Sequence, residues 1–448
     1  MKKITYMLLL NIINCFSQPE IYSWLQNTET TGNYYIAGSP VLVPNNILVN
    51  CQKVQFSNDY VYVTATGVPS YPTGPFLDGN PSNAQNQAVI FKITRNPQQN
   101  LDDLTYTTPG NIGVFINGVA LFDYRDGVAW NSNTNQLCGG PGNPPCPGGF
   151  LAEMDWNRDA ILAEMEGFDC AKGHPAMGNY HHHQNPSAFK LDRFLVSDVC
   201  DLYDSEGLYV IDSTAHSPLL GYAFDGFPIY GAYGYQNNDG SGGVVRIESG
   251  YNLRSITERT HHADGTDVED GPSISEYFLG YFREDYEFID QDEDKYLDEH
   301  NGRLCVTPEY PEGTYAYFCT VDENWNSKYP YAVGPTFYGE YSNSMTNNIL
   351  EQTTTYYQTN LNNESLTVGF NAFINKSSEL IIVQCLGLVK ENTKVNVIDL
   401  NGKILKSTQI FPGQTLASID SRALYNGLYI IEIIQNNKRL IKKLAISR

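Results

Sequence analysis

The chain has 448 residues, and 41% of them are hydrophobic, which is enough for the cores of two or three domains. Its 50 Asp and Glu residues outnumber its 28 Lys and Arg residues, so the net charge is −22 at pH 7. Such an acidic protein is repelled by nucleic acid and by anionic lipid, so it is a poor candidate for binding either, and we expect no nucleic-acid partner.

The first 17 residues have the features of a secretory signal peptide. Two lysines follow Met1, residues 4–13 are almost wholly apolar, and Ser17 is a small residue before the expected cut. No later stretch has the roughly 18 apolar residues that a membrane-spanning helix needs. We therefore expect residues 1–17 to be removed from an exported, soluble protein without a transmembrane segment.

Eight cysteines follow Cys15, and an even number in an oxidising compartment favours disulfides. Three pairs are favoured by their positions: Cys138–Cys146 across a Gly- and Pro-rich loop, Cys170–Cys200 on either side of the histidines, and Cys305–Cys319 between two strands. The remaining two cysteines are Cys51 and Cys385. These pairings are hypotheses, because sequence alone does not determine connectivity.

Residues 18–344 are rich in segments typical of β-strands. Residues 60–64, 89–93 and 315–318 consist largely of β-branched and aromatic residues and are bounded by Gly, Pro or Asn. The sequence therefore predicts a large, mainly β domain with few helices.

One helix is predicted within this domain, at residues 158–166. Asn157 would cap its N-terminus and Gly167 would end it. Its apolar stripe would consist of Ile161, Leu162, Met165 and Phe168.

Two segments of the domain resemble each other. Residues 112–122 contain Asn117-Gly118 between two apolar runs, and residues 220–230 contain Asp225-Gly226 in the same position. Asn-Gly and Asp-Gly between apolar runs are strong signals of a β-hairpin. The two hairpins could form pseudo-symmetric halves of one sheet or barrel.

A cluster of histidines lies between these hairpins in the sequence. On a strand, His181 and His183 lie on one face, while Tyr180 and His182 lie on the other. Their Cα atoms are then about 6.6 Å apart, so both rings can reach one metal ion. His174 could supply a third ligand across a turn. Alternatively, the histidines could lie in a solvated loop or be hydrogen-bonded core residues.

Six segments resemble the YHYH family: residues 156–160, Gly173-His174 with 180–183, 216–222, 225–231, 297–303 and 307–318. The second tyrosine of the family signature is replaced by His182. The resemblance implies a shared architecture, and it implies that His174, His181, His183 and His216 act together. It does not imply a particular reaction.

The C-terminal part of the chain has a different composition. Residues 345–373 are rich in Thr, Asn and Gln and are predicted to be a linker. Residues 374–448 contain eleven Lys and Arg residues against five Asp and Glu residues, a net charge of +6. Their apolar strands around Asn426-Gly427 predict a small β-sandwich. This part resembles the C-terminal sorting domain of the type IX secretion system, which implies contact with that machinery and export across the outer membrane.

Together, these features predict a secreted or cell-surface YHYH protein with a zinc or copper site. The ligands would be His174, His181 and His183, with His216 or a solvent molecule in the fourth position. Imidazole nitrogens suit both metals. Tyr180 and Asp225 would orient ligating imidazoles. The alternative is a non-enzymatic surface module that binds carbohydrate or protein, with structural histidines. The sequence does not establish whether the protein is an enzyme.

Overall fold

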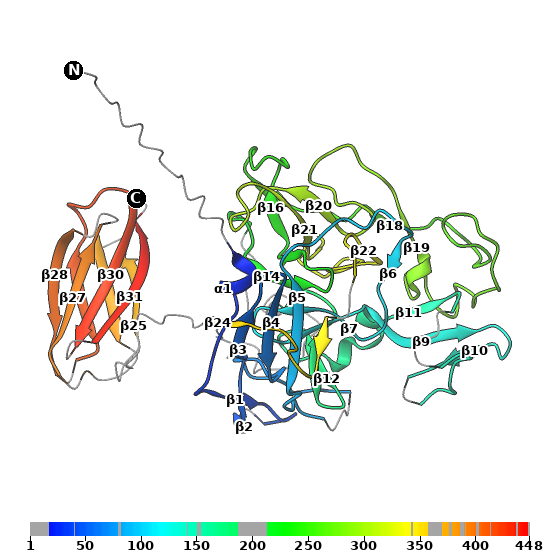
Figure 1. Cartoon of the computed structure of the whole chain (residues 1–448), viewed down its shortest axis with the longest axis horizontal. Coiled ribbons are helices and arrows are strands. Elements are labelled where there is room, and N and C mark those ends of the chain that lie inside the picture. The colour runs from blue at the N-terminus through cyan, green and yellow to red at the C-terminus, as the bar shows by residue number, and fades with distance from the viewer. Residues whose placement is uncertain are drawn as a thin grey trace, which may run out of the picture. The chain divides into compact units, whose positions relative to one another are not determined.

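The protein divides into two units, Met1–Tyr357 and Gln358–Arg448. The computed structural model describes residues 18–356 and 370–446, with gaps at 40, 79–81, 141, 150–153, 187–212, 342–343, 376–378, 386–388, 390, 400–402, 413 and 436–437. The predicted signal peptide and residues 357–369 of the predicted linker lie outside the described residues. Both units are mainly β, as predicted (Figure 1).

The largest sheet of the first unit has eight strands. In spatial order they are β12 (Gly173–Ala176), β13 (Asn179–His182), β8 (Ala120–Phe122), β7 (Asn111–Phe115), β14 (Leu219–Ala223), β15 (Pro228–Tyr230), β21 (Thr314–Phe318) and β20 (Gly302–Cys305). Strands β14 and β15 are buried along their whole length. A strand that is buried on both faces carries consecutive apolar residues, and this explains the continuous apolar run in β14.

The two predicted hairpins form the centre of this sheet. Strands β7 and β8 join through Asn117-Gly118, and β14 and β15 join through Asp225-Gly226. Strand β7 pairs with β14, with Val114 opposite Tyr222. A second hairpin extends the sheet on each side through a parallel strand pair: β13 pairs with β8, and β21 pairs with β15. The prediction of two pseudo-symmetric halves of one sheet is confirmed. We call β7, β8, β12 and β13 the first half-sheet, and β14, β15, β20 and β21 the second half-sheet.

A five-stranded sheet shares its hydrophobic core with the eight-stranded sheet. Its strands, in spatial order, are β23 (Met345–Thr346), β5 (Val89–Thr94), β4 (Tyr60–Ala65), β3 (Cys51–Phe56) and β24 (Thr354–Tyr356). Figure 1 shows β3, β4 and β5 side by side. Residues 345–356, the first part of the predicted linker, thus supply two edge strands, which suits their threonine content.

Smaller sheets and short helices complete the first unit. The three-stranded sheet consists of β10 (Gln136–Cys138), β9 (Arg125–Asn131) and β11 (Asn157–Asp159). The strand pairs are β1 (Thr31–Tyr34) with β2 (Val43–Leu48), β16 (Tyr233–Tyr235) with β17 (Val244–Arg246), β18 (Tyr251–Leu253) with β19 (Tyr286–Phe288), and β6 (Thr105–Tyr106) with β22 (Thr336–Phe337). Among the described residues of this unit, the helical segments are α1 (Pro19–Tyr22), α2 (Ala160–Ala163), and the 3₁₀ turns η1 (Met165–Gly167) and η3 (Arg283–Asp285).

The predicted helix at residues 158–166 is shorter than expected. Residues 157–159 form strand β11, and α2 begins only at Ala160. The N-cap is Asp159 instead of Asn157, because the Asp159 carboxylate accepts a hydrogen bond from the Ile161 N–H at 2.8 Å. The chain then tightens into the 3₁₀ turn η1, which ends at Gly167 as predicted.

One predicted disulfide is confirmed, one is wrong and one is only partly described. Cys138 and Cys146 are bonded. Cys170 is also disulfide-bonded, but its predicted partner Cys200 lies outside the described residues. Cys305 and Cys319 are free, because Cys305 pairs in register with Thr314, five residues before Cys319. Five strand residues span about 17 Å, too far for a disulfide.

The second unit consists of two sheets with one core, as predicted for a small β-sandwich. One sheet contains β25 (Phe370–Asn375), β26 (Leu380–Cys385) and β29 (Leu416–Asp420). The other contains β28 (Ile404–Ile410), β27 (Thr393–Ile398), β30 (Gly427–Gln435) and β31 (Lys438–Ile446). Alternating Val and Ile residues fill the space between them, among them Ile381, Val383, Val395 and Val397.

Candidate metal centre

The histidine cluster lies on a tight hairpin at the edge of the first half-sheet. Strands β12 and β13 pair with His174 directly opposite His181. Met177 and Gly178, the two residues between the strands, both have positive φ (50° and 87°). This left-handed pair closes a two-residue hairpin and determines the register. The sequence therefore places His174 across the hairpin from the histidine pair.

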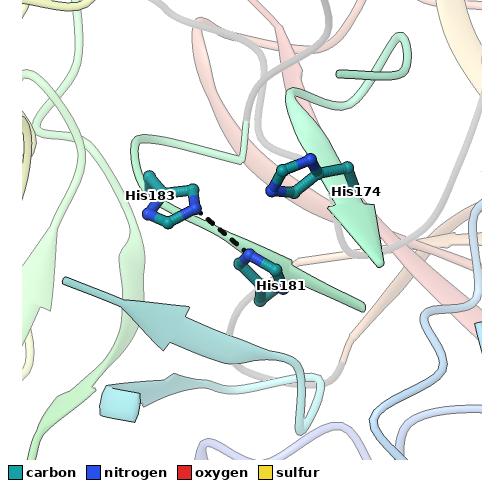
Figure 2. A group of neighbouring side chains, drawn as sticks. All are labelled: His174, His181 and His183. Carbon is teal, nitrogen blue, oxygen red and sulfur yellow. Dashed lines mark hydrogen bonds between the residues drawn. The ribbon is translucent and has the colours of Figure 1, made fainter. Parts of the chain in front are cut away.

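His174, His181 and His183 converge on one point (Figure 2). One ring nitrogen of each lies within 4.8 Å of the others, and the Nε2 atoms of His181 and His183 are 3.1 Å apart. The residues are 7%, 1% and 4% exposed. Three buried imidazoles thus present nitrogen atoms to a common centre.

Backbone carbonyls orient two of the three rings. The Nδ1–H of His181 donates to the Asn179 carbonyl at 2.9 Å, and the Nδ1–H of His183 donates to the Asp123 carbonyl at 2.5 Å. A carbonyl only accepts, so each bond fixes the proton on Nδ1. The Nε2 atoms of both rings therefore face the centre, the orientation found in histidines that ligate metals.

A carboxylate from another part of the chain joins the cluster. The Glu164 Oε2 atom lies 3.3 Å from His174 Nε2 and 3.4 Å from His183 Nε2. Glu164 was not predicted, because an acidic residue in an amphipathic helix carries no local sign of such a role. It arrives here because α2 ends at Ala163 and the chain turns into η1.

Burial and this carboxylate set the charge of the rings. Burial lowers the pKa of His174 to about 4, and it also lowers the pKa of His181 well below its ordinary value. Burial also opposes charge on His183 and Glu164, but their mutual attraction outweighs it, raising the pKa of His183 and lowering that of Glu164. His174 and His181 are therefore neutral at pH 7, the form in which imidazole binds metals.

The other face of β13 has a structural role. Tyr180 is fully buried and donates its hydroxyl to both oxygens of Asp169, at 3.0 and 2.9 Å. His182 Nε2 lies 2.7 Å from the Tyr71 hydroxyl, and its Nδ1 lies 3.1 Å from the Lys172 carbonyl. Tyr180 thus braces the hairpin through Asp169, instead of bonding a ring of the cluster.

His216 and Asp225 lie apart from the cluster, by the second half-sheet. The His216 ring packs against Tyr230 and Tyr235, with centroids 5.2 and 4.8 Å apart. Asp225 accepts hydrogen bonds from the Tyr317 hydroxyl at 2.6 Å and the Gly339 N–H at 2.9 Å. The structure therefore does not bring His216 to the other three histidines, and Asp225 orients the β14–β15 turn instead of an imidazole.

A cavity of about 440 Å³ lies beside the cluster. All four residues of the predicted apolar stripe line it, together with Tyr251, Leu253, Tyr286, Tyr329, Tyr331 and several polar side chains. Phe168 also packs edge-on against His174, with centroids 4.8 Å apart. Lys172 and Gln184, which flank the histidine hairpin, line the same cavity. The cavity and the cluster therefore share Phe168 as a wall.

Two family models match the chain. The one described as YHYH protein matches residues 90–330, more than half of the chain, and includes the histidine cluster. The chain belongs to the YHYH family. The model of the secretion system C-terminal sorting domain matches residues 373–447, which contain the β-sandwich. No curated protein matches the chain.

The sorting domain determines where this YHYH protein acts. Such a domain directs type IX secretion to the cell surface or the exterior, through contact with the secretion machinery. No helix in the described part of the chain has the length and apolar character needed to cross a bilayer. In the YHYH domain, the departure at His182 falls on the structural face of β13, away from the three converging histidines.

Proposed function

We propose that the YHYH domain binds one transition metal ion, zinc or copper, through His174, His181 and His183. The observation that carries the proposal is the convergence of three buried imidazoles, two with Nδ1 tied to a carbonyl. The 3.1 Å between the His181 and His183 Nε2 atoms supports it. Two ligands at about 2.0–2.1 Å in a tetrahedral site are about 3.3–3.4 Å apart.

The second half-sheet supports this proposal, because it repeats the hairpin without the histidines. Gly173 pairs with His182 in the first half-sheet, and Gly302 pairs with Tyr317 in the second. Tyr315 donates to both oxygens of Asp298, at 2.9 and 3.1 Å, just as Tyr180 does to Asp169.

In this alignment the three histidines correspond to Arg303, Ala316 and Phe318. The Arg303 guanidinium lies over the Phe318 ring, 5.3 Å from its centroid, where the first half-sheet has two imidazoles. The hairpin frame therefore forms with or without histidines at these positions. This weighs against the alternative in which the histidines serve only to hold the fold.

The bound metal would supply Lewis acidity at a buried point beside the cavity. The protein would hold the His181 and His183 rings in one orientation through their Nδ1 bonds and exclude water, since all three rings are buried. The cavity next to Phe168 would offer space for an organic group close to the metal.

Elemental analysis of protein purified without an affinity tag tests the proposal. We expect about one equivalent of zinc or copper per chain in the wild type, and in a His261→Ala control, whose side chain is exposed at the surface. His183→Ala should lose most of the metal. His183→Gln, which preserves more volume, guards against misfolding, and circular dichroism checks the fold. A folded wild-type protein that neither retains nor takes up metal would refute the proposal.

A further inference from the structure

Glu164 extends a carboxylate oxygen towards the Nε2 atoms of His174 and His183, at 3.3 and 3.4 Å. This Oε2 atom is buried, and it has no hydrogen bond of good geometry in the described structure. Its contacts are ion-pair contacts with two rings at once. A buried carboxylate oxygen beside two imidazoles needs a compensating positive charge, which a protonated His183 or a bound metal ion would supply.

The backbone holds Glu164 in this place from both sides. Its N–H donates to the Ala160 carbonyl at 2.8 Å and closes α2. Its own carbonyl accepts from the Gly167 N–H at 2.8 Å and starts η1. The break between the two helical segments therefore falls at the residue that faces the histidines, so the backbone of Glu164 is fixed where its side chain can reach them.

Three of the six distances within a set of four ligands match a tetrahedral site, and the ring nitrogens of the three histidines all lie within 4.8 Å of one another. Nitrogen and oxygen ligands at about 2.0–2.1 Å from zinc are about 3.3–3.4 Å from one another. The measured separations are 3.1 Å for His181–His183, 3.3 Å for His174–Glu164 and 3.4 Å for His183–Glu164. Three edges of one tetrahedron thus agree with the expected length to within about 0.3 Å.

The neighbouring acidic residue provides a contrast. Glu166, two positions further on, is exposed, whereas the Glu164 side chain is only 27% exposed. Glu164 lies at the junction of α2 and η1 and Glu166 lies within η1, so the two differ in the direction they face. Glu166 is therefore a matched control for charge, size and local sequence.

We propose that Glu164 is the fourth ligand, so that the centre is a three-histidine, one-carboxylate site. This inference rests on the metal-binding function proposed above. A carboxylate oxygen favours a divalent ion over Cu(I), whose preferred ligands are thiolates and thioethers. Its negative charge also partly neutralises a divalent ion in a site where the other three ligands are neutral.

Zinc titration of the full chain against a chromophoric chelator tests the assignment, with wild type, Glu164→Gln and Glu166→Gln side by side. We expect Glu164→Gln to weaken zinc binding at least 10- to 100-fold, the loss typical of removing even an indirect partner of a metal ligand. Glu166→Gln should bind like the wild type. Glu164→Ala provides a second variant, should the Gln variant fail to fold.

The outcomes separate the two proposals. If the wild type binds zinc and both Glu164 variants bind equally well, the ligand assignment is refuted and the three-histidine site stands. If the wild type takes up no zinc, the metal-binding proposal itself fails. The visible spectrum of the cobalt-substituted protein gives an independent readout, since loss of a ligand changes the band positions in Glu164→Gln and leaves them unchanged in Glu166→Gln.

Discussion

Removal of the Tyr180 hydroxyl should destabilise the histidine hairpin in a pH-dependent way. In Tyr180→Phe the buried ring stays, and the bonds to the two Asp169 oxygens, at 3.0 and 2.9 Å, are lost. The Asp169 carboxylate keeps three backbone donors, from Gly74, Ala171 and Gly173. The substitution should therefore lower the free energy of unfolding by the contribution of one hydroxyl donor, and it leaves no new cavity.

The magnitude depends on the charge of Asp169. Burial raises the pKa of Asp169 to about 7, so the folded protein loses stability as the pH rises through about 7. Hydrogen bonds donated to the carboxylate offset that loss. A bond to a charged group contributes about 1.5–3 kcal/mol, and a neutral one about 0.5–1.5 kcal/mol. The destabilisation by Tyr180→Phe should therefore be larger at pH 8 than at pH 5.

Urea unfolding followed by tryptophan fluorescence measures this difference. The four tryptophans, Trp24, Trp130, Trp156 and Trp325, all lie in the first unit, so the signal reports that unit alone. A chelator in the buffer keeps metal binding out of the comparison. An equal or smaller loss of unfolding free energy at pH 8 than at pH 5 would show that Tyr180 does not stabilise a charged Asp169.

Three further predictions concern the hairpin, the disulfide and the metal. Gly173→Ala should lower both the midpoint of thermal unfolding and zinc uptake, because the new Cβ would lie 2.4 Å from the Tyr180 hydroxyl oxygen. Gly302→Ala is equally crowded but lies in the second half-sheet, so it should lower only the midpoint of thermal unfolding. Replacing Cys138 and Cys146 by Ser should cost about 2–3 kcal/mol in urea unfolding, from the lost closure of a short loop. Zinc at 100 times its Kd should stabilise the first unit by about 2.7 kcal/mol, and an unchanged fluorescence midpoint would contradict this.

Features that depend on local pattern could be predicted well. The β class follows from runs of β-branched and aromatic residues, and the central hairpins follow from Asn117-Gly118 and Asp225-Gly226. The separation of His182 from His181 and His183 follows from the period of two along a strand. Each of these needs only residues within about ten positions of one another, where backbone geometry leaves few alternatives.

The helix that carries Glu164 shows where local pattern fails. Of its predicted apolar stripe, Ile161 and Phe168 are buried, whereas Leu162 and Met165 are exposed. Asp159 caps the helix later than expected, and the helix breaks at Glu164 to form η1. The apolar stripe lines a cavity. Propensity favoured a longer regular helix, and contacts with distant residues such as Tyr331, which donates to Asp159 at 2.6 Å, overrode it.

The sequence alone was sufficient to identify the export domain, the β architecture and the histidine hairpin, since these are encoded in neighbouring residues. Only the folded chain brings Glu164 to the histidines, leaves His216 among tyrosines, and keeps Cys305 from Cys319. These outcomes depend on strand register and on the packing of segments far apart in the sequence. A one-residue change of register moves a side chain to the opposite face of a sheet, so the spacing of such residues along the chain does not specify their distance in space.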